Sequence, residues 1–240
     1  MFLENVVFDA LDPGVLGRFW EGILATTTLT DTADVFETRL IVVDGPVLDL
    51  CFQPVAEPHT PGSRIHLDLV GGERQTEVVE RALVLGGRHL DIGQRDVPWV
   101  VMADPEGNAF CVMEARPEYS RSGPIAAIPV ESRDPARDLE FWTELSGWVV
   151  DYTEMPGAMR HPSGRGPLIE LCPEPAAKGP NKNGLHLDLR LESGDDADAV
   201  VSRVLDLGGR ELHPDWGDLP WRILADPSGN EFCLLPARQG

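Results

Sequence analysis

The sequence predicts an α+β protein built from two tandem copies of one unit. A stretch of 31 residues, from Leu83 to Met113, recurs without gaps from Leu205 to Leu235, with 16 identical positions. Upstream, IHLDL at 65–69 matches LHLDL at 185–189. Because the motifs keep the same order in both halves, we interpret the pattern as a duplication. We therefore predict domains at 1–116 and 124–240, joined at 117–123 by an exposed polar linker.

Each copy contains the signals for the same series of elements. Asp12 is a suitable N-cap and Pro13 a suitable first helical residue, and apolar residues follow with helical spacing. The turn Asp-Pro-Glu-Gly-Asn precedes the last strand. In the first copy we expect strands at 6–8, 35–43, 47–53, 64–70, 97–103 and 109–114, with a second helix at 78–85; the second copy opens with a strand at 128–130 and a helix from 135. The chain thus carries four βαβββ-like modules.

Composition limits the classes of partner. With 240 residues, of which 42% are hydrophobic, the chain can bury a sizeable core. The formal charge of −20 disfavours nucleic acid and anionic membranes as partners. It favours a cationic ligand if the charge also lines a pocket, whereas the alternative is that it serves solubility. No apolar run approaches the roughly 20 residues of a membrane span, and the first residues do not read as a signal peptide, so we expect a cytoplasmic protein.

The cysteines are spaced without any C-x-x-C pair. Cys111 matches Cys233 in the repeat, and Cys51 is aligned with Cys172. In a cytoplasmic chain they are expected to be reduced thiols, with one pair on different strands of each domain. Packing as small core side chains is one interpretation, and a metal or reactive-thiol role is the other.

A His–Asp pair opens the second module of each copy. His66 and Asp68 alternate with Leu67 and Leu69, so the polar and apolar side chains lie on opposite faces of a strand. Because an unpaired Asp is costly in an apolar core, we expect the His–Asp face to line a concave pocket. The carboxylate either orients the imidazole for ligand binding, or the pair is internally satisfied. The same two interpretations apply to His186 and Asp188.

The order of H-L-D-L, a helix ending in L-G-G and D-P-x-G-N-x-F resembles the vicinal-oxygen-chelate superfamily, the glyoxalase/bleomycin-resistance/extradiol-dioxygenase family. The resemblance covers nearly the whole chain and occurs once per repeat. It implies paired βαβββ modules that form a cupped antiparallel sheet in each domain, with the ligand inside the cup. Members include metal-dependent isomerases, lyases and dioxygenases, and also metal-free proteins that sequester an antibiotic, so the fold does not determine the function.

The resemblance also implies where metal ligands would lie. The first-strand position falls at Asn5 or Ala127, and the fourth-strand position falls at Cys51 or Gln53 in the first copy and at Cys172 or Glu174 in the second. Ala127 cannot bind a metal, and Cys111 and Cys233 stand where the metalloenzymes have Glu. We therefore expect no metal and favour no cofactor; a divalent metal, if bound, would use His66, Cys111, His186, Glu174 and Cys233.

These considerations favour a small-molecule-binding protein without the usual catalytic metal set, of the resistance or sequestration kind. The alternative is a divergent metal-dependent lyase, isomerase or dioxygenase. The candidate ligand-binding residues are His66, Asp68, Cys111, Gln53, His186, Asp188, Cys233 and Glu174. If one copy is active, we favour the second, because Glu174 is expected near His186. We expect a monomer, because the duplication supplies the pairing of modules within one chain.

Overall fold

The computed structural model confirms the α+β class and the two tandem repeats. It describes residues 1–57, 63–151, 157–214 and 217–238. Within these residues there are four α-helices: α1 (Pro13–Leu24), α2 (Gln75–Val84), α3 (Pro135–Ser146) and α4 (Ala197–Asp206). Asp12 and Asp134 cap α1 and α3 as their sequence predicts, each accepting a hydrogen bond from a backbone amide of the first turn. None of the helices in the described part of the chain combines the length and hydropathy that a membrane crossing requires.

The strands form two eight-stranded sheets. Sheet A has the order β14 (Arg210–Leu212), β15 (Arg222–Ala225), β16 (Glu231–Leu235), β13 (Leu185–Arg190), β1 (Phe2–Ala10), β4 (Val47–Pro54), β3 (Phe36–Ile41) and β2 (Thr27–Asp31). Sheet B has the order β10 (Val149–Val150), β11 (Ala158–Arg160), β12 (Leu168–Pro173), β9 (Ile125–Ser132), β5 (Leu67–Val70), β8 (Ala109–Met113), β7 (Val100–Ala103) and β6 (Arg88–His89). The strands β2 and β6 have no counterpart in the sequence prediction.

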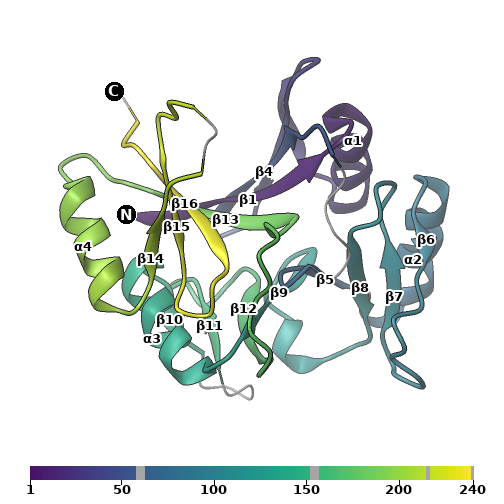
Figure 1. Ribbon diagram of the computed structural model, residues 1–240. Helices are drawn as coiled ribbons and strands as arrows, with labels where there is room; N and C mark the ends of the chain where they lie inside the picture. Colours follow the sequence, from purple (N-terminus) through teal and green to yellow (C-terminus); the bar gives the residue numbers. More distant parts are fainter. Residues whose placement is uncertain (58–62, 152–156, 215–216, 239–240) are drawn as a thin grey trace.

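Each sheet joins modules from different repeats. In sheet A, β1 of the first repeat pairs antiparallel with β13 of the second, and Figure 1 shows the two strands side by side. In sheet B, β5 of the first repeat pairs antiparallel with β9 of the second. Within each module the first and last long strands run parallel, as β1 and β4 do. The modules therefore pair as expected, but each cup is shared by the two repeats instead of belonging to one of them, and each sheet is mixed.

The helices and the outer faces of the sheets make the hydrophobic core. In the first repeat, Trp20 of α1 contacts Phe8 of sheet A at 5.2 Å and Phe110 of sheet B at 5.2 Å between ring centroids. In the second repeat, Trp142 contacts Phe232 in the same way at 5.3 Å. Each repeat thus packs its own helices and aromatic rings, while the backbone pairing of the sheets crosses between repeats.

The D-P-x-G-N turn fixes the helix against the last strand. The carboxylate of Asp104 accepts hydrogen bonds from the backbone amides of Glu106, Gly107 and Asn108, and from the indole Nε1 of Trp20 at 3.1 Å. Asp226 accepts from Trp142 at 3.3 Å in the second repeat. These contacts satisfy a carboxylate that is fully buried, which explains how the turn tolerates it.

The segment between the repeats is exposed at Pro117, Ser120, Arg121 and Gly123, but its polar composition does not predict the two buried side chains within it. It contains a short 3₁₀ helix, η2 (Pro117–Tyr119), and both Tyr119 and Ser122 are buried. The guanidinium of Arg160, itself buried, donates to the carbonyl of Glu118 at 2.9 Å and to the hydroxyl of Ser122 at 3.1 Å. The two buried side chains therefore anchor this segment to the folded interior.

Candidate functional site: the two cups

Strand alternation gives each sheet an inner face, which points away from the helices and which we call its cup. Leu187 and Leu189 of β13 pack into the core, so His186 and Asp188 lie on the cup side of sheet A. Leu67 and Leu69 likewise send His66 and Asp68 to the cup of sheet B. The alternation of polar and apolar residues in both H-L-D-L strands thus corresponds to the two faces of each sheet.

In sheet A, three potential donor groups converge from β13 and β16. The ligand atoms of His186, Asp188 and Cys233 all lie within 4.8 Å of one another. Asp188 accepts a hydrogen bond of 2.9 Å from the amide of Asn5, which comes from β1 of the other repeat. His186 Nε2 lies 3.5 Å from Asp188 Oδ1. Asn5, which occupies the first-strand position of a metal ligand in the family's metalloenzymes, therefore holds the Asp188 carboxylate instead.

Burial makes all three groups of sheet A favour their neutral forms. Desolvation lowers the pKa of His186 to about 3, with a smaller contribution from the charge of Lys182. Desolvation raises the pKa of Asp188 to about 7 against the opposing hydrogen bond from Asn5. It also raises the pKa of the Cys233 thiol. At neutral pH the thiol is therefore a poor nucleophile, and the cluster is not a thiolate–imidazolium pair.

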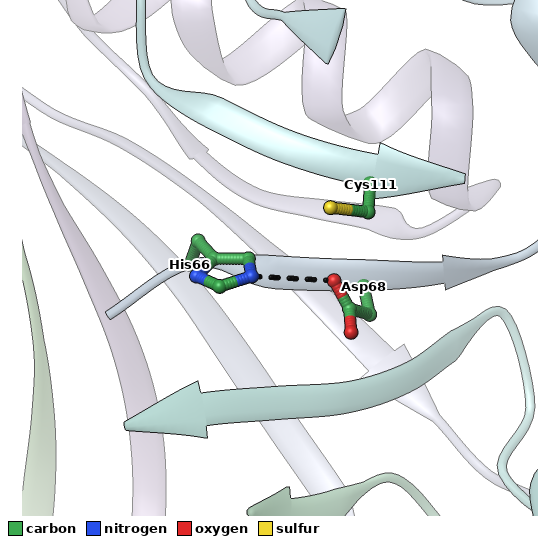
Figure 2. Close-up of side chains that lie close together, drawn as sticks. All are labelled: His66, Asp68 and Cys111. Atoms are coloured by element: carbon green, nitrogen blue, oxygen red, sulfur yellow. Dashed lines mark ion pairs between the residues drawn. The ribbon is translucent and has the colours of Figure 1, made fainter. Parts of the chain in front are cut away.

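The corresponding cluster in sheet B is more open. Figure 2 shows His66 and Asp68 from one segment of chain and Cys111 directed toward them from the neighbouring strand β8. Their ligand atoms also lie within 4.8 Å of one another, and His66 Nε2 is 3.4 Å from Asp68 Oδ1. The His66 side chain is 32% exposed, against 4% for His186, so solvent reaches only the first of the two imidazoles easily.

Sheet B also holds a buried carboxyl group that the sequence analysis did not single out. Glu170 of β12 is 6% exposed and accepts a hydrogen bond of 3.4 Å from the hydroxyl of Tyr119. Desolvation, followed by the nearby charge of Asp68, raises the pKa of Glu170 to about 7. Alternation within LIELCP places Glu170 on the same face as Cys172, and this alternation was the available signal.

Sheet A contains a second missed carboxylate at the corresponding end of its cup. Asp49 pairs with Asn5 in the register of β1 and β4 and forms two hydrogen bonds of 2.7 Å with the Arg39 guanidinium. Glu4 binds Arg190 and Arg238 close by. Alternation within VLDLCFQP puts Asp49 on the face of Cys51 and Gln53, but the partner Arg39 cannot be inferred from spacing.

The strand register corrects two sequence predictions about the cysteines. Cys51 and Cys111 do not share a cup, because β4 belongs to sheet A and β8 to sheet B. Cys51 and Cys172 are also not equivalent. In sheet A, Cys51 of β4 pairs with Val7 of β1; in sheet B, the residue of β12 at the matching position is Glu170, which pairs with Pro129 of β9. A slip of two residues keeps every side chain on its face, so the sequence pattern does not reveal it. All four cysteines are free thiols, as predicted.

The prediction that Glu174 lies near His186 is also wrong. Glu174 follows β12 in sheet B, where its backbone amide binds the carbonyl of Ser132. Gln53 of the first repeat instead lines a cavity together with His186. The exchange follows from the shared sheets, since β13 has the first-repeat strand β1 as its neighbour.

That cavity, of about 500 Å³, lies in the cup of sheet A. One wall is apolar and is formed by Leu219, Trp221 and Ile223. Asp9 of β1, His186 of β13, and Glu231 and Cys233 of β16 also line the cavity. The remaining lining residues are Gln53, Pro54, Val55, Ala56 and Lys182. Of the predicted candidates, Gln53, His186 and Cys233 thus line one cavity, and Asp188 is clustered with His186 and Cys233. His66, Asp68 and Cys111 form the second cluster.

The donor sets differ from those expected of the family's metalloenzymes but are chemically suited to a soft divalent ion. Imidazole, carboxylate and thiolate are all zinc ligands. Among the described residues, buried atoms without a hydrogen-bond partner include His186 Nδ1, Asp188 Oδ1 and Asp68 Oδ1. Against this, Asn5 and Asp49 already bind protein groups, and Ala127 offers no donor. In the described part of the chain, each cup therefore brings three donor side chains close enough together to hold an ion.

The raised pKa of Glu170 predicts a pH-dependent stability. Between about pH 4.5 and pH 7 the unfolded chain releases the Glu170 proton while the folded protein keeps it, so this group lowers stability as the pH rises through that range. Glu170→Gln, which stays neutral, should therefore gain stability relative to the wild type from pH 4.5 to pH 7. Urea unfolding at several pH values measures the difference. Exposed Glu80→Gln is the control, and a pH-independent difference for Glu170→Gln would contradict the assignment.

Comparison with known proteins agrees with this architecture. The model of the glyoxalase-like domain family matches residues 5–113 and again 127–235. A glyoxalase I mutant from Zea mays has a TM-score of 0.67 at 15% identity, covering 98% of this chain and 93% of that one. A putative dioxygenase from Bacillus subtilis subsp. subtilis str. 168 has a TM-score of 0.60 at 14% identity, covering 100% and 86%. These likenesses show the fold, and the search of curated proteins found no match. The chain therefore belongs to the glyoxalase-like domain family of the vicinal-oxygen-chelate superfamily, as two tandem copies.

Proposed function

We propose that this protein binds an uncharged, largely apolar small molecule in the cup of sheet A, as a sequestration or resistance protein does. The cavity of about 500 Å³ carries the proposal. Its size falls in the range of roughly 300–1,000 Å³ that is typical of small-molecule sites. An apolar wall with a few convergent polar groups is the usual composition of such a site.

Trp221 gives the cavity its strongest binding surface. The indole comes from the segment just before β15, packs in one cluster with Leu219, Ile223 and Cys233, and lines the same cavity as His186. Aromatic side chains favour stacked or edge contacts with flat ligands and contribute most of the binding free energy where they are buried in a pocket. A planar aromatic ligand fits this wall.

The charges around the cavity argue for an uncharged ligand over the cationic one that the net charge led us to expect. Asp9 forms an ion pair with Lys182, and Glu231 forms one with Lys178 at 2.7 Å. A cation would have to compete with these lysines for the carboxylates. The neutral imidazole of His186 can donate one hydrogen bond to the ligand or accept one from it.

The same features support binding without a chemical step. The thiol of Cys233 and the imidazole of His186 favour their neutral forms, and neither is activated as a nucleophile. We further propose that the protein works as a monomer, because β1 with β13 and β5 with β9 complete both cups within one chain.

Truncation of Trp221 tests the proposed site. Ligand-observed NMR with indole and other uncharged bicyclic aromatics should identify a binder, and Trp221→Ala should weaken its binding by about 2 kcal/mol, roughly 30-fold. Trp99→Ala, at the matching position of the other repeat, is the control and should leave the affinity unchanged. Equal loss in both variants, or no binder among the uncharged aromatics, would contradict the proposal.

The two His–Asp–Cys clusters favour one alternative, a divergent metal-dependent lyase, isomerase or dioxygenase. His186, Asp188 and Cys233 would hold the ion in sheet A, and His66, Asp68 and Cys111 would hold it in sheet B. Such an ion would polarise a ligand oxygen as a Lewis acid. In that case Asn5 would orient the Asp188 carboxylate through its hydrogen bond.

Metal content separates these alternatives. Native mass spectrometry of protein purified without chelator or nickel affinity should show well below one metal ion per chain if the protein is a metal-free binder. Zinc at one or two equivalents, lost in Cys233→Ser or Cys111→Ser, would favour the enzyme. Cys51→Ser is the matched control, because Cys51 belongs to neither cluster.

A further inference from the structure

The end of the sheet-B cup that receives Tyr119 has the composition of an aromatic binding site. The Tyr119 ring, which is 4% exposed, packs in one cluster with Met113, Ala127, Ala158 and Leu168. Two of these neighbours are alanines, which leave room for a six-membered ring above the strands. The ring enters from η2 and is not carried by any strand of the sheet.

The corresponding end of the sheet-A cup shows that this composition is particular to sheet B. Strand register matches Ala127 with Asn5, Leu168 with Asp49, and Val70 with Arg190. In sheet A these positions carry the amide and ion pairs that close that end of the cup. In sheet B the same three positions are apolar, so the side chains at this end of the cup offer an apolar surface on which an aromatic ring can pack.

Polar groups at this end of the cup contact both the hydroxyl and the ring of Tyr119. The Tyr119 hydroxyl donates to the buried Glu170 carboxyl at 3.4 Å. The Arg116 guanidinium carbon lies 5.7 Å from the Tyr119 ring centroid and 5.6 Å from that of Trp99, within the range of cation–π contact. Asp68 Oδ1, on the same cup face, is buried without a hydrogen-bond partner among the described residues.

We propose that this end of the sheet-B cup is a binding site for phenols, and that Tyr119 occupies it as an intramolecular ligand. The site consists of the alanine-lined floor, the Glu170 carboxyl for the hydroxyl, and the Arg116 guanidinium beside the ring. It is distinct from the sheet-A cavity and takes a different class of ligand: a single ring bearing a hydroxyl group. A free phenol binds there when the Tyr119 side chain is removed.

Removal of the ring tests this site. Tyr119→Ala should bind p-cresol, the free counterpart of the tyrosine side chain, at one additional equivalent by calorimetry and should show a saturable rise of Tm. It should bind p-cresol at least about tenfold more tightly than toluene, because Glu170 is left without a partner when no hydroxyl is present. Tyr119→Phe, which keeps the ring in place, should bind neither compound at this site.

A control cavity distinguishes a site that is specific for phenols from a non-specific apolar cavity in the core. Phe52→Ala removes a fully buried ring that packs against Phe8 and Phe36, and its cavity should not prefer p-cresol over toluene. If Tyr119→Ala is unfolded by circular dichroism, p-cresol but not toluene should restore the folded spectrum. Equal binding or equal rescue by the two compounds, or no binding to a folded variant, would overturn the proposal.

Discussion

The antiparallel pairing of β1 with β13, and of β5 with β9, is the contact on which both cups depend. The first strand of each module has hydrogen-bonding groups on two sides, and its own module satisfies only one of them, as β4 does for β1. The other side must find a strand, because unpaired backbone groups in the centre of a sheet are costly. The second repeat supplies that strand in sheet A, and the same rule applies in sheet B.

This pairing determines which side chains can act together. Asn5 and Asp188 are 183 positions apart in the chain and share a hydrogen bond in one cup. Gln53 and His186 line one cavity for the same reason. A duplication that exchanges modules in this way yields two cups of mixed origin, and each can diverge independently. Sheet A has become an ion-paired cup with an apolar cavity, whereas sheet B encloses Tyr119 against Glu170.

The sequence predicts the local elements well because their signals are local. Asp12 before Pro13 predicts the start of α1, and the alternation of His66, Leu67 and Asp68 predicts which face meets the cup. The partners across the sheets are not local, so the sequence placed Glu174 beside His186 when Gln53 is the residue that lies there. The polar composition of residues 117–123 likewise gives no sign that the Tyr119 ring is buried in the sheet-B cup, because its partners there lie on distant strands.

The most direct test of shared cups is the contact between β1 and β13 in solution. In a deuterated, amide-protonated sample, NMR should show cross-strand nuclear Overhauser effects that connect Val6 with Leu187 and Val7 with His186, as the antiparallel register requires. Effects that instead connect Val7 with His66 would place both modules of one repeat in the same sheet. That result would contradict the account of both cups.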